Sequence, residues 1–591
     1  MQATVALTGG GGWPMTVFLT PDGRPFYAGT YFPREARGGL PGFADLCRAL
    51  AAAYRERRDD VEAQAEQVAQ RLRSMSERRR GEGELEPSLL EDATVGLARV
   101  FDPAEGGFGG APKFPPSLAL EFLLRRAWRR PEDHHAREMA ELTLAKMAAG
   151  GIHDQVGGGF HRYSVDGIWL VPHFEKMLYD NALLARAYAL AHRVTGGAHH
   201  RVVAEMTLDY LLREMRLPGG GFAAAQDADS PGGEGAFFVW TPGELAEVLE
   251  PAEARAVTLR FGVRPEGNFE GRSILHVVAG VDAVGRELGM DAAPLLASAR
   301  RKLYEARRRR PAPMRDDKVI ASWNGLAIAA FADAGVMLGR PDYIDAATAT
   351  AAFALDALVV DGRLRRVFAD GRADRLGQLD DHADLCHGLL CLYAATFQPR
   401  WLAAARSLAE RMLELFHDPQ AGGFYYAPAD GEELIARTRD LEDHPTPSGN
   451  SQAAHVLLRL ADLTGDPSLE EPAAGALRLV RAEMARFPQA FGTALVTLDH
   501  LLGERREVAV VGPPDDPGTR RLIEAARSLA GPADALAAGD PDDAGAVAAA
   551  PLLAERPLVE GRPAAYVCRR FTCAAPVTEP EELAEVMAVA G

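Results

Sequence analysis

The loop at residues 226–234 concentrates acidic side chains close to aromatic ones. Asp227 and Asp229 stand two residues apart, Glu234 follows, and Trp240 comes soon after. Carboxylate pairs beside aromatic rings are the residue types of glycosyl chemistry, in which one acid protonates the leaving oxygen, one base activates water and rings stack on the sugar. A loop of Asx turns or a bound cation explains the same residues equally well. Both interpretations stay open at this point.

A second group of candidate residues surrounds His173 and Glu175, immediately before a predicted helix. His161 and Arg162 lie in the same segment between helices, so one stretch of chain carries several histidines and donors suited to a carbonyl or hydroxyl group. An acid at this place also interacts favourably with the helix dipole, whatever its function. The clustering favours a functional interpretation.

A third group begins a predicted helix over residues 380–396. Asp384 and His387 share one face of this helix, and Asp381 and His382 lie beside that face at its N-terminal end. Acids at a helix start are usually caps, and this is the leading interpretation. If the helices form a ring, however, this end faces the histidine-rich segment. A proton acceptor on one wall and a donor on the other would suit an epimerase or an inverting hydrolase.

Polar and aromatic residues mark the beginnings of two further predicted helices. Asn450 is a natural N-cap, which is its leading interpretation, and Trp323 suits either a core position or a stacking platform next to Asn324. The candidate catalytic residues are therefore Asp227, Asp229, His173, Glu175 and Asp381. The candidate substrate-binding residues are His161, Arg162, Tyr179, Asp180, Trp240, Trp323, Asn324, His382 and Asn450.

A repeated Gly-Gly-Phe motif marks the helical elements that must position these residues. It occurs at residues 106–108, 158–160, 220–222 and 422–424, each time after a helix-forming run. Self-similarity along a chain indicates a repeat architecture, and repeated helix pairs must close or be capped to bury their apolar faces. Function is expected in the loops at one end of such a ring.

Helical periodicity dominates from Pro87 to about Gly503, with apolar residues at spacings of three and four. The predicted helices make about six pairs, and the β-rich stretches 157–171, 219–240 and 422–437 are expected to cover one mouth of the ring as short hairpins. The predicted helices are Ser117–Arg129, Arg137–Ala149, Lys176–Thr195, Arg201–Arg216, Pro242–Leu249, Ala292–Arg309, Trp323–Leu338, Tyr343–Val359, Asp380–Thr396, Trp401–Phe416, Ser451–Leu463 and Ser468–Met484.

The two ends of the chain differ from this pattern. Residues 13–32 form two β-rich runs around a Pro-Asp-Gly turn, which predicts a hairpin, and a long helix is expected over Phe43–Arg80. The last part alternates a strand at Glu507–Gly512, a helix at Gly518–Leu529 and a strand at Ala564–Cys568, which predicts a small α/β module. The predicted domains are residues 1–82, 83–503 and 504–591.

Composition restricts the class of protein. The formal charge is −18, from 65 basic and 83 acidic residues in 591, so neither nucleic acid nor an anionic membrane is an expected partner. The apolar helix candidate Gly325–Gly339 is interrupted by Asp333 and too short to span a bilayer. No secretory leader opens the chain, and a soluble cytoplasmic protein is predicted.

The cysteines support a reducing compartment. Five cysteines in so long a chain give no disulfide framework. Cys568 and Cys573 have four residues between them, but no nearby His or Cys completes a zinc site, so a structural role is favoured over a metal or redox role. No metal and no cofactor are predicted.

Several long phrases of the sequence together resemble the thioredoxin-domain-containing, spermatogenesis-associated protein family. The likeness covers nearly the whole chain, and the phrases follow one another in the family's order. They are Trp13-Pro-Met-Thr16 with Val17–Gly23, His173–Asn181, Gln226–Ser230, Phe238–Thr241, Asp317–Gly325, Leu379–Asp381 and Thr446–Asn450.

The resemblance implies a mainly α protein, with a thioredoxin-like domain fused to an (α/α)6 toroid similar to six-hairpin glycosidases and sugar 2-epimerases. Two departures follow from it. The first half of the thioredoxin-like domain, with any redox cysteine pair, would lie upstream of Met1, and Cys47 stands alone. Relatives usually place a tyrosine where this chain has His382, so the role of His382 is open.

The predicted function is that of a carbohydrate-active enzyme, glycosidase-like or epimerase-like, with general acid–base chemistry in the toroid mouth and a small saccharide ligand. Two alternatives stay open: a non-catalytic scaffold that binds a ligand or a protein, and a thioredoxin-linked redox protein whose redox half is missing from this chain. Substrate identity, stereochemical course and oligomeric state are not predicted.

Overall fold

The computed structural model describes residues 1–76, 81–432, 435–570 and 572–589. The chain forms two compact units, one of residues 1–80 with 425–440 and one of residues 81–424 with 441–591. The predicted helical region and the predicted C-terminal module thus belong to one unit, and the segment 425–440 belongs to the other. The three predicted domains stay a prediction.

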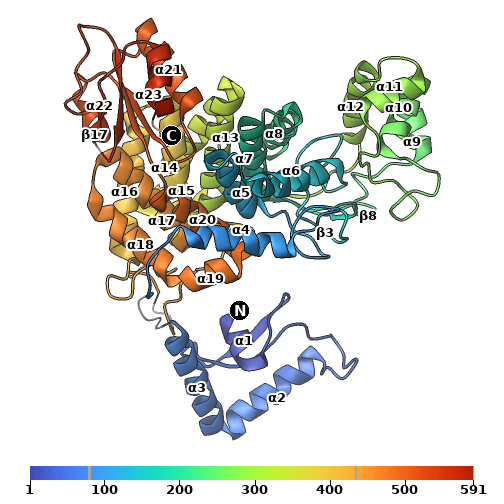
Figure 1. The fold of residues 1–591 in the computed structure, drawn as a ribbon. Helices are drawn as coiled ribbons and strands as arrows, with labels where there is room; N and C mark the ends of the chain where they lie inside the picture. The colour runs from blue at the N-terminus through green and yellow to red at the C-terminus, as the bar shows by residue number, and fades with distance from the viewer. Residues whose placement is uncertain (77–80, 433–434, 571, 590–591) are drawn as a thin grey trace. The chain divides into compact units, whose positions relative to one another are not determined.

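Six helices of the larger unit form a closed inner ring. Each contacts the next in chain order, and the last returns to the first. This closure confirms the predicted (α/α)6 toroid, which depended on helix pairs wrapping into a ring. The inner helices, labelled in Figure 1, are α5 (Ser117–Arg129), α7 (Leu178–Thr195), α13 (Ala321–Leu338), α15 (Leu379–Thr396), α17 (Gly449–Thr464) and α20 (Gly492–Leu502).

An outer layer of helices packs on this ring. Each of α6, α8, α14, α16 and α18 packs on the inner helix that precedes it, while α4, from the start of the unit, packs on α20 from its end. Elements far apart in the sequence therefore join where the ring closes. The outer helices are α4 (Ser88–Val100), α6 (His134–Ala149), α8 (Ala198–Tyr210), α14 (Pro341–Leu358), α16 (Pro399–Phe416) and α18 (Glu470–Leu479).

Inner and outer helices differ in their pattern of burial. The outer helix α16 buries one stripe, as its apolar spacing predicts. The inner helix α13 is buried nearly all round. By length and composition α13 is, among the described residues, the one helix apolar enough to cross a membrane, and 78% of that stretch is buried. Its place inside the ring accounts for its apolar composition.

Long loops precede the inner helices, and short turns follow them. We call the loops 150–177, 216–241, 308–320 and 359–378, which precede α7, α13 and α15, the mouth of the ring. Because the inner helices begin at these loops, their N-terminal ends, with their positive dipole ends, face the mouth.

Short strands line the mouth, where hairpins were predicted. Three small sheets pair β3 with β4, β6 with both β5 and β9, and β7 with β8. A four-stranded sheet that was not predicted places β12 beside β10, β11 and β13. The strands are β3 (Tyr163–Ser164), β4 (Pro172–His173), β5 (Lys176–Met177), β6 (Ala225–Gln226), β7 (Asp229–Ser230), β8 (Gly233–Glu234), β9 (Arg315–Asp316), β10 (Val319–Ile320), β11 (Val359–Val360), β12 (Arg363–Ala369) and β13 (Arg372–Leu376). Of the predicted hairpin at 422–437, residues 433 and 434 lie outside the described residues.

Four helices between β8 and β9 form an insertion with its own small core. They pack on one another around Val257 and Leu303. Only the first and last of the four were predicted. They are α9 (Pro242–Val248), α10 (Pro251–Phe261), α11 (Val281–Leu288) and α12 (Ala293–Arg307).

The C-terminal module is α/β, as predicted. Its strand order is β15-β14-β16-β17, with β14 parallel to β15 and antiparallel to β16. Helix α21 crosses between the two parallel strands, in the way that parallel neighbours require. The strand β15 was not predicted. The elements are β14 (Glu507–Val511), α21 (Pro517–Leu529), β15 (Ala535–Gly539), α22 (Ala544–Ala549), β16 (Ala564–Arg569), β17 (Thr572–Cys573) and α23 (Pro580–Val589).

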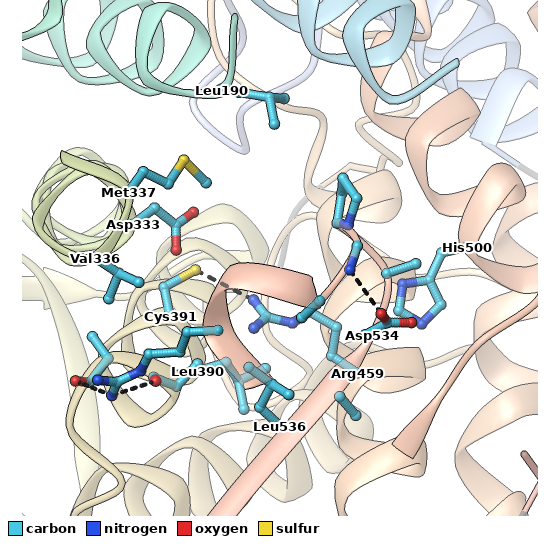
Figure 2. Close-up of a pocket in the computed structure, with 18 of the residues that line it drawn as sticks. Leu190, Asp333, Val336, Met337, Leu390, Cys391, Arg459, His500, Asp534 and Leu536 are labelled. Atoms are coloured by element: carbon cyan, nitrogen blue, oxygen red, sulfur yellow. Dashed lines mark hydrogen bonds between the residues drawn. The ribbon is translucent and has the colours of Figure 1, made fainter. Parts of the chain in front are cut away.

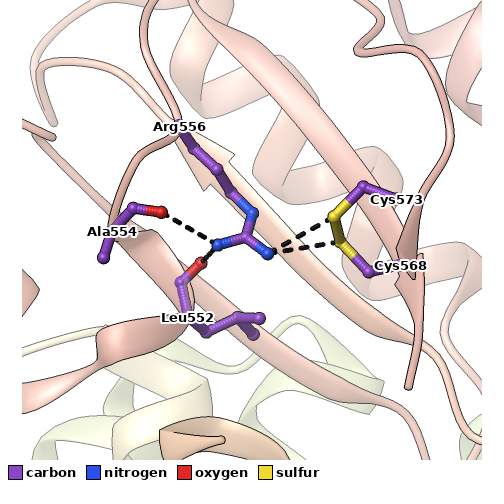
Figure 3. The surroundings of a disulfide bond; sticks show 5 residues. All are labelled: Leu552, Ala554, Arg556, Cys568 and Cys573. Atoms are coloured by element: carbon purple, nitrogen blue, oxygen red, sulfur yellow. Dashed lines mark hydrogen bonds between the residues drawn. A yellow bond between two sulfur atoms is a disulfide. The ribbon is translucent and has the colours of Figure 1, made fainter. Parts of the chain in front are cut away.

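A disulfide joins Cys568 to Cys573 in this module, and the expectation that no cysteines pair is wrong for these two. They lie directly opposite each other in β16 and β17, with Cα atoms 3.8 Å apart. The Arg556 guanidinium lies 3.4 Å from both sulfur atoms and also donates to the Ala554 carbonyl (Figure 3). The tight turn between the strands creates this pairing, and the spacing of the two cysteines alone did not reveal it.

The smaller unit contains the predicted hairpin. Strands β1 (Thr16–Leu19) and β2 (Pro25–Gly29) pair antiparallel. The predicted helix Phe43–Arg80 is instead two helices, α2 (Phe43–Glu56) and α3 (Arg58–Ser76), because Arg57 leaves helical geometry. Residues 77–80 lie outside the described part. A short helix, α1 (Gln2–Thr8), precedes the hairpin.

Candidate functional site

His173 stands at the mouth between two glutamates. Its Nδ1 atom lies 2.7 Å from Oε1 of Glu234, and its Nε2 atom lies 3.8 Å from Oε2 of Glu175. The side chain is 30% exposed. A carboxylate against one ring nitrogen orients the imidazole and leaves the other nitrogen for proton transfer. Glu234 belongs to the acidic loop described from the sequence, but it was not among the predicted site residues.

Aromatic rings continue from His173 toward solvent. Tyr163, opposite His173 in the β3–β4 pair, stacks on the imidazole with ring centres 5.1 Å apart. Phe114 stacks on Tyr163 at 4.7 Å and is 49% exposed. Such a row of exposed rings can pack against the apolar face of a sugar. Neither ring was among the predicted site residues, because stacking depends on contacts between distant segments.

Arg162 links His173's neighbour Glu175 to a buried acid. Its guanidinium donates to Oε2 of Glu175 at 2.8 Å. Asp180, in the first turn of α7, is 4% exposed, and its Oδ2 atom has no hydrogen-bond partner among the described residues. Burial raises the pKa of Asp180 well above its ordinary value; Arg162 opposes this shift and Glu175 adds to it. Burial therefore favours the protonated form of Asp180, in which the carboxyl group can donate a proton.

Tyr179 and Trp323 join the first turns of α7 and α13. Their rings meet edge to face at 4.7 Å. Burial also raises the pKa of Tyr179, so its hydroxyl stays protonated. The mouth thus contains a continuous group of predicted residues from His173 through Arg162 to Trp323.

Asp381 lies at the start of α15, next to this group. Its carboxylate accepts hydrogen bonds from the Ser322 and Gln378 backbone amides at 3.2 and 2.8 Å, and Arg366 of β12 donates to it at 2.7 Å. Complete burial, with the neighbouring Asp380 also held by Arg366, raises the pKa of Asp381 to about 7. Arg366 was not predicted, because the strand that carries it was not predicted.

Asp227 and Asp229 occupy a turn beside the site. Oδ1 of Asp227 accepts from the Asp229 backbone amide at 3.2 Å, which is an Asx turn, the structural alternative considered for this loop. Asp229 is exposed and lies opposite Glu234 in the β7–β8 hairpin. The loop therefore places Glu234, rather than either aspartate, on the imidazole of His173.

Three predicted binding residues are buried away from the mouth cluster. His161 Nδ1 lies 2.8 Å from the Phe174 carbonyl oxygen, and burial lowers the pKa of this imidazole well below its ordinary value. Trp240 belongs to the core of the insertion, with the Arg310 guanidinium 3.9 Å from its ring centre. His382 is buried, and its Nδ1 lies 2.9 Å from the Gln378 carbonyl oxygen.

The predicted binding residues Asn324 and Asn450 hold the Gly-Gly-Phe loops. Asn324 Oδ1 accepts from the Phe222 backbone amide at 2.8 Å, and its Nδ2 donates to the Phe222 carbonyl at 3.2 Å. Asn450 holds Phe424 in the same way, at 2.7 and 2.8 Å. Both ends of each amide are therefore occupied by backbone, which makes these residues structural clamps.

The same clamp recurs at the other asparagines of the chain. Asn181 holds Phe160 at 2.7 and 3.0 Å, and Asn268, in the insertion, holds Ile274 at 2.7 and 2.9 Å. All four asparagines in the sequence thus clamp one residue's backbone. At Gly159, with φ of +79°, a side chain would come 2.5 Å from Tyr210, so the loop needs glycine there.

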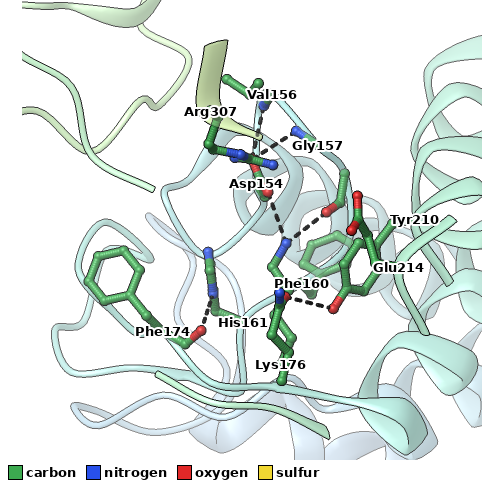
Figure 4. Close-up of polar contacts among 12 residues, drawn as sticks. Asp154, Val156, Gly157, Phe160, His161, Phe174, Lys176, Tyr210, Glu214 and Arg307 are labelled. Atoms are coloured by element: carbon green, nitrogen blue, oxygen red, sulfur yellow. Dashed lines mark hydrogen bonds and ion pairs between the residues drawn. The ribbon is translucent and has the colours of Figure 1, made fainter. Parts of the chain in front are cut away.

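A buried ionic network holds the backbone next to His173, and it was not predicted. Lys176 donates to Oδ2 of Asp154 and to the Gly158 carbonyl, both at 2.9 Å, and Arg307 donates to Oδ1 of Asp154 at 2.8 Å (Figure 4). Burial lowers the pKa of Lys176 to about 8. The network fixes β5, which leads directly from His173 into α7.

This network repeats a simpler one in the first Gly-Gly-Phe loop. Lys113 donates to Asp102 at 2.7 Å and to the Gly106 carbonyl at 2.9 Å. Because the same lysine–aspartate–glycine arrangement occurs twice, it belongs to the repeat architecture. Among the described residues, no group of three or more His, Cys, Asp or Glu side chains is placed to hold a metal ion.

One comparison with known proteins matches the N-terminal segment, and others match almost the whole chain. A family model described as Thioredox_DsbH, protein of unknown function, DUF255, matches residues 1–73. The chain is 34% identical to spermatogenesis-associated protein 20 of Homo sapiens, over 99% of this chain and 80% of that protein. An uncharacterized protein of Caenorhabditis elegans is 30% identical, over 99% of this chain and 85% of its own length.

Solved structures with a similar fold are more distant. A D-mannose isomerase has a TM-score of 0.43 and 13% identity, covering 68% of this chain and 87% of its own. An unsaturated glucuronyl hydrolase from Bacillus sp. GL1 has a TM-score of 0.41 and 14% identity, covering 70% of this chain and 95% of its own. These likenesses concern the arrangement of helices alone.

Proposed function

The chain belongs to the spermatogenesis-associated protein 20 family, and from the chemistry at the mouth of its ring we propose that it is a carbohydrate-active enzyme that moves a proton next to a sugar carbonyl, as isomerases and 2-epimerases do. The observation that carries this proposal is the partly exposed His173, held at 2.7 Å by Glu234, together with the buried acid Asp180, whose protonated form is favoured by burial. A base and a proton donor that both reach one sugar are what such a reaction requires.

The proposed step is written for an open-chain aldose. Nε2 of neutral His173 takes the proton from C2, the C2–H electron pair forms the C1=C2 double bond, and the carbonyl oxygen takes the proton of Asp180. The product is an enediol, with His173 protonated and Asp180 ionised. When His173 returns its proton to C1, the O2 hydroxyl returns one to Asp180 and a ketose results. Return to C2 would give the starting sugar or its epimer.

The surrounding residues support the two proton-transfer groups. Glu234 stabilises the imidazolium that forms on His173, and Arg162, close to Asp180, stabilises the carboxylate left after proton donation. Phe114 and Tyr163 offer ring faces to the sugar. In this proposal the ligand is a small saccharide, and neither a nucleic acid nor a membrane is a partner.

Hydrolysis of a glycoside is the second candidate, because Asp229 faces Glu234 across the β7–β8 hairpin. Glycosidases use a pair of carboxylates separated by about 5 to 9.5 Å. We rank it below proton transfer, since Glu234 is engaged with His173 at 2.7 Å and Asp229 is exposed in a turn.

Deuterium exchange tests the proposal. The protein is incubated with aldoses, ketoses and N-acetylated hexosamines in D2O, and incorporation at C1 or C2 is followed by NMR. His173→Gln and Glu234→Gln should slow exchange by about 100-fold or more, the usual contribution of a general base. His135→Gln is the matched control, because His135 lies near Glu138 on the exposed face of α6.

Three other results would each contradict the proposed proton transfer. Release of reducing ends from glycosides without exchange would favour hydrolysis. Thermal stabilisation by a sugar without any turnover would favour the non-catalytic binding alternative, because a ligand of the native state raises the melting temperature. If no sugar of the panel showed deuterium exchange or thermal stabilisation, a saccharide site would be rejected.

A further inference from the structure

A second site lies at the opposite end of the inner helices from the mouth. A cavity of about 140 Å3 is lined by residues from all six inner helices and is covered by residues 530–536 of the C-terminal module. Figure 2 shows Asp333, Cys391, Arg459 and His500 around it, with Leu536 from the module. An apolar cavity of about 150 Å3 is large enough to hold benzene, so this one has room for a small organic molecule.

Among the described residues, every charged side chain of the cavity lining but one is held by an opposite charge or by backbone carbonyls: the acids, Arg125 and Arg186 form ion pairs, and Arg193 and Arg527 donate to carbonyl groups. Arg186 lies 2.7 Å from both Glu121 and Asp333, and Arg125 lies 2.8 Å from Glu121. Asp462 and Asp534 are paired with Arg505 and Arg506, which lie outside the lining. The carboxylates that line the cavity therefore already have cationic partners.

Arg459 is the exception. Its guanidinium lies 3.3 Å from Sγ of Cys391 and 3.5 Å from Nδ1 of His387, and among the described residues it makes no ion pair with a carboxylate. Burial keeps both partners neutral, since it raises the pKa of Cys391 to about 11 and lowers that of His387 well below its ordinary value. The cavity thus carries a cation whose direct contacts among the described residues are neutral groups, and a partly buried cation favours an anion.

Three polar atoms on almost fully buried side chains of the lining have no hydrogen-bond partner among the described residues. They are Nδ1 of His455, Nδ1 of His500 and the hydroxyl of Tyr393, all on side chains at most 3% exposed. His500 is fixed from its other side, where Nε2 lies 2.7 Å from Asp462. Buried polar atoms without partners are rare in native proteins, and here they gather around one cavity from α15, α17 and α20. The remaining wall includes Leu190, Val336 and Leu536, which are apolar.

A surface groove leads to this cavity. The groove, of about 1270 Å3, runs between the ring and the C-terminal module and shares Arg193, Val336, Met337, Ala395 and Arg527 with the cavity lining. Arg193 donates to the Ala530 carbonyl of the module, and Arg527 donates to the Ala395 carbonyl of the ring, both at 2.6 Å. Two cations therefore stand where groove and cavity meet, and a negatively charged ligand would be attracted through this passage.

We propose that the cavity is a binding site for a small organic carboxylate of about six to nine non-hydrogen atoms in all, with a compact apolar body. The carboxylate would lie on Arg459, within reach of the Tyr393 hydroxyl and an imidazole N–H, and the apolar body would pack against Leu190, Val336 and Leu536. This site is independent of the mouth, since it shares no residue with the His173 cluster.

Titration calorimetry on the full chain tests the site with isobutyrate and benzoate as probes. Isobutyramide is the neutral match for isobutyrate, and inorganic phosphate is an anion without an apolar body. We expect the two carboxylates to bind, and isobutyramide and phosphate to bind at least about tenfold more weakly, because a charge-assisted hydrogen bond is lost in one case and the apolar contacts in the other. Equal binding of isobutyrate and isobutyramide, no binding by either acid, or preference for phosphate would each overturn the proposal.

Substitutions separate the cavity from other anion sites. Arg459→Met removes the cation and should weaken carboxylate binding by about tenfold or more, and Tyr393→Phe, which removes only the hydroxyl, should weaken it by a smaller factor. Arg411→Met is the matched control, because Arg411 is exposed on α16 beside Glu414. Unchanged affinity in Arg459→Met, or an equal loss in Arg411→Met, would contradict the assignment.

A measurement on the unmodified protein covers the case in which Arg459→Met fails to fold. In the chain labelled with 15N-histidine, isobutyrate should shift the imidazole signals of His455 and His500 and leave those of the exposed His134 and His135 in place. Signals are assigned with single His→Gln variants. Absence of a selective shift at saturating isobutyrate would reject the site.

Discussion

His161 and His173 lie in one loop, yet their surroundings give them different chemistry. His161 is buried between Phe174 and Phe238, so its imidazole stays neutral and structural. His173 lies at the end of a strand, half-exposed, with Glu234 on one nitrogen. The sequence places both histidines near the site, but only the contacts with Phe238 and Glu234, more than 60 residues away along the chain, distinguish them.

Asp180→Asn should separate stability from activity. Burial favours the protonated acid and its Oδ2 makes no hydrogen bond to a described residue, so an amide of the same shape should change the free energy of unfolding by less than about 1 kcal/mol. In the proposed reaction the same change should lower exchange by about 100-fold. Urea denaturation and the deuterium assay measure the two effects. A loss of more than about 2 kcal/mol would mean that Asp180 is ionised and paired.

Asp381 should make stability depend on pH in the acidic range. Its pKa is about 7 in the folded protein and about 3.9 in an unfolded chain. The folded state therefore binds more protons between these values, so this group's stabilisation is complete below about pH 4 and is lost as the pH rises through about 7.

The comparison that checks this is between the wild type and Asp381→Asn. From pH 4 to pH 7.5 the wild type should lose up to about 4 kcal/mol of unfolding free energy relative to the variant, the value of a shift of about three pKa units. Denaturation by urea at each pH provides the measurement. A difference that is constant across this range would show that Asp381 is ionised throughout.

At the scale of elements, the asparagine clamps explain how the Gly-Gly-Phe loops are attached to the inner helices. Asn181→Ala and Asn324→Ala each remove three hydrogen bonds, two of them to the backbone of Phe160 or Phe222, which is left buried and unpaired. We expect each to lower the free energy of unfolding by about 2–3 kcal/mol. Gln64→Ala, on the exposed face of α3, is the control and should stay within about 0.5 kcal/mol. Small losses in both clamp variants would mean that the loops are held by other contacts.

The disulfide should contribute to the C-terminal module. It closes a loop with a sequence separation of five residues, and the chain-entropy estimate for a loop of that size is about 2 kcal/mol. Reduction with dithiothreitol, or the double change Cys568→Ser with Cys573→Ser, should lower the free energy of unfolding by that amount. The remaining cysteines, Cys47, Cys386 and Cys391, should stay free under both conditions.

Alkylation followed by mass spectrometry checks the same pair. Without reductant, the exposed Cys573 should resist alkylation although it is accessible. Modification of Cys573 in the native, unreduced protein would show that the two thiols are not joined there.

At the scale of the whole molecule, the ring depends on one closure between distant segments. Helix α20 meets α5 at Gly492, where an added Cβ would come 2.5 Å from the Leu118 backbone. Gly492→Ala should therefore force the helices apart and destabilise the protein by about 1–3 kcal/mol. Gly475→Ala in α18 is the matched control, since its Cβ would meet nothing closer than 3.6 Å and should be neutral or stabilising by up to about 1 kcal/mol. Thermal unfolding of both variants measures the difference.

The helix pairs, their order and the loops that carry the candidate residues could be predicted without coordinates. Helical periodicity is a local property, because residues three and four apart lie on one face of a helix, and the Gly-Gly-Phe phrase marks each loop by residues that its backbone needs. Burial of the apolar helix faces required the pairs to close or to be capped, and a closed ring was what the family resemblance implied. These features arise from neighbours in the sequence and from the need to bury apolar surface.

The state of each polar group was decided by the tertiary structure. Whether Asp180 holds a proton, which acid contacts His173, and why Asn324 and Asn450 serve the backbone depend on burial and on partners from distant segments. The cavity around Arg459 is the clearest case, because six helices and a separate α/β module each contribute part of its wall. Electrostatic and hydrogen-bond energies depend on distances of a few ångströms and on the exclusion of water, and only the folded arrangement of the chain sets these.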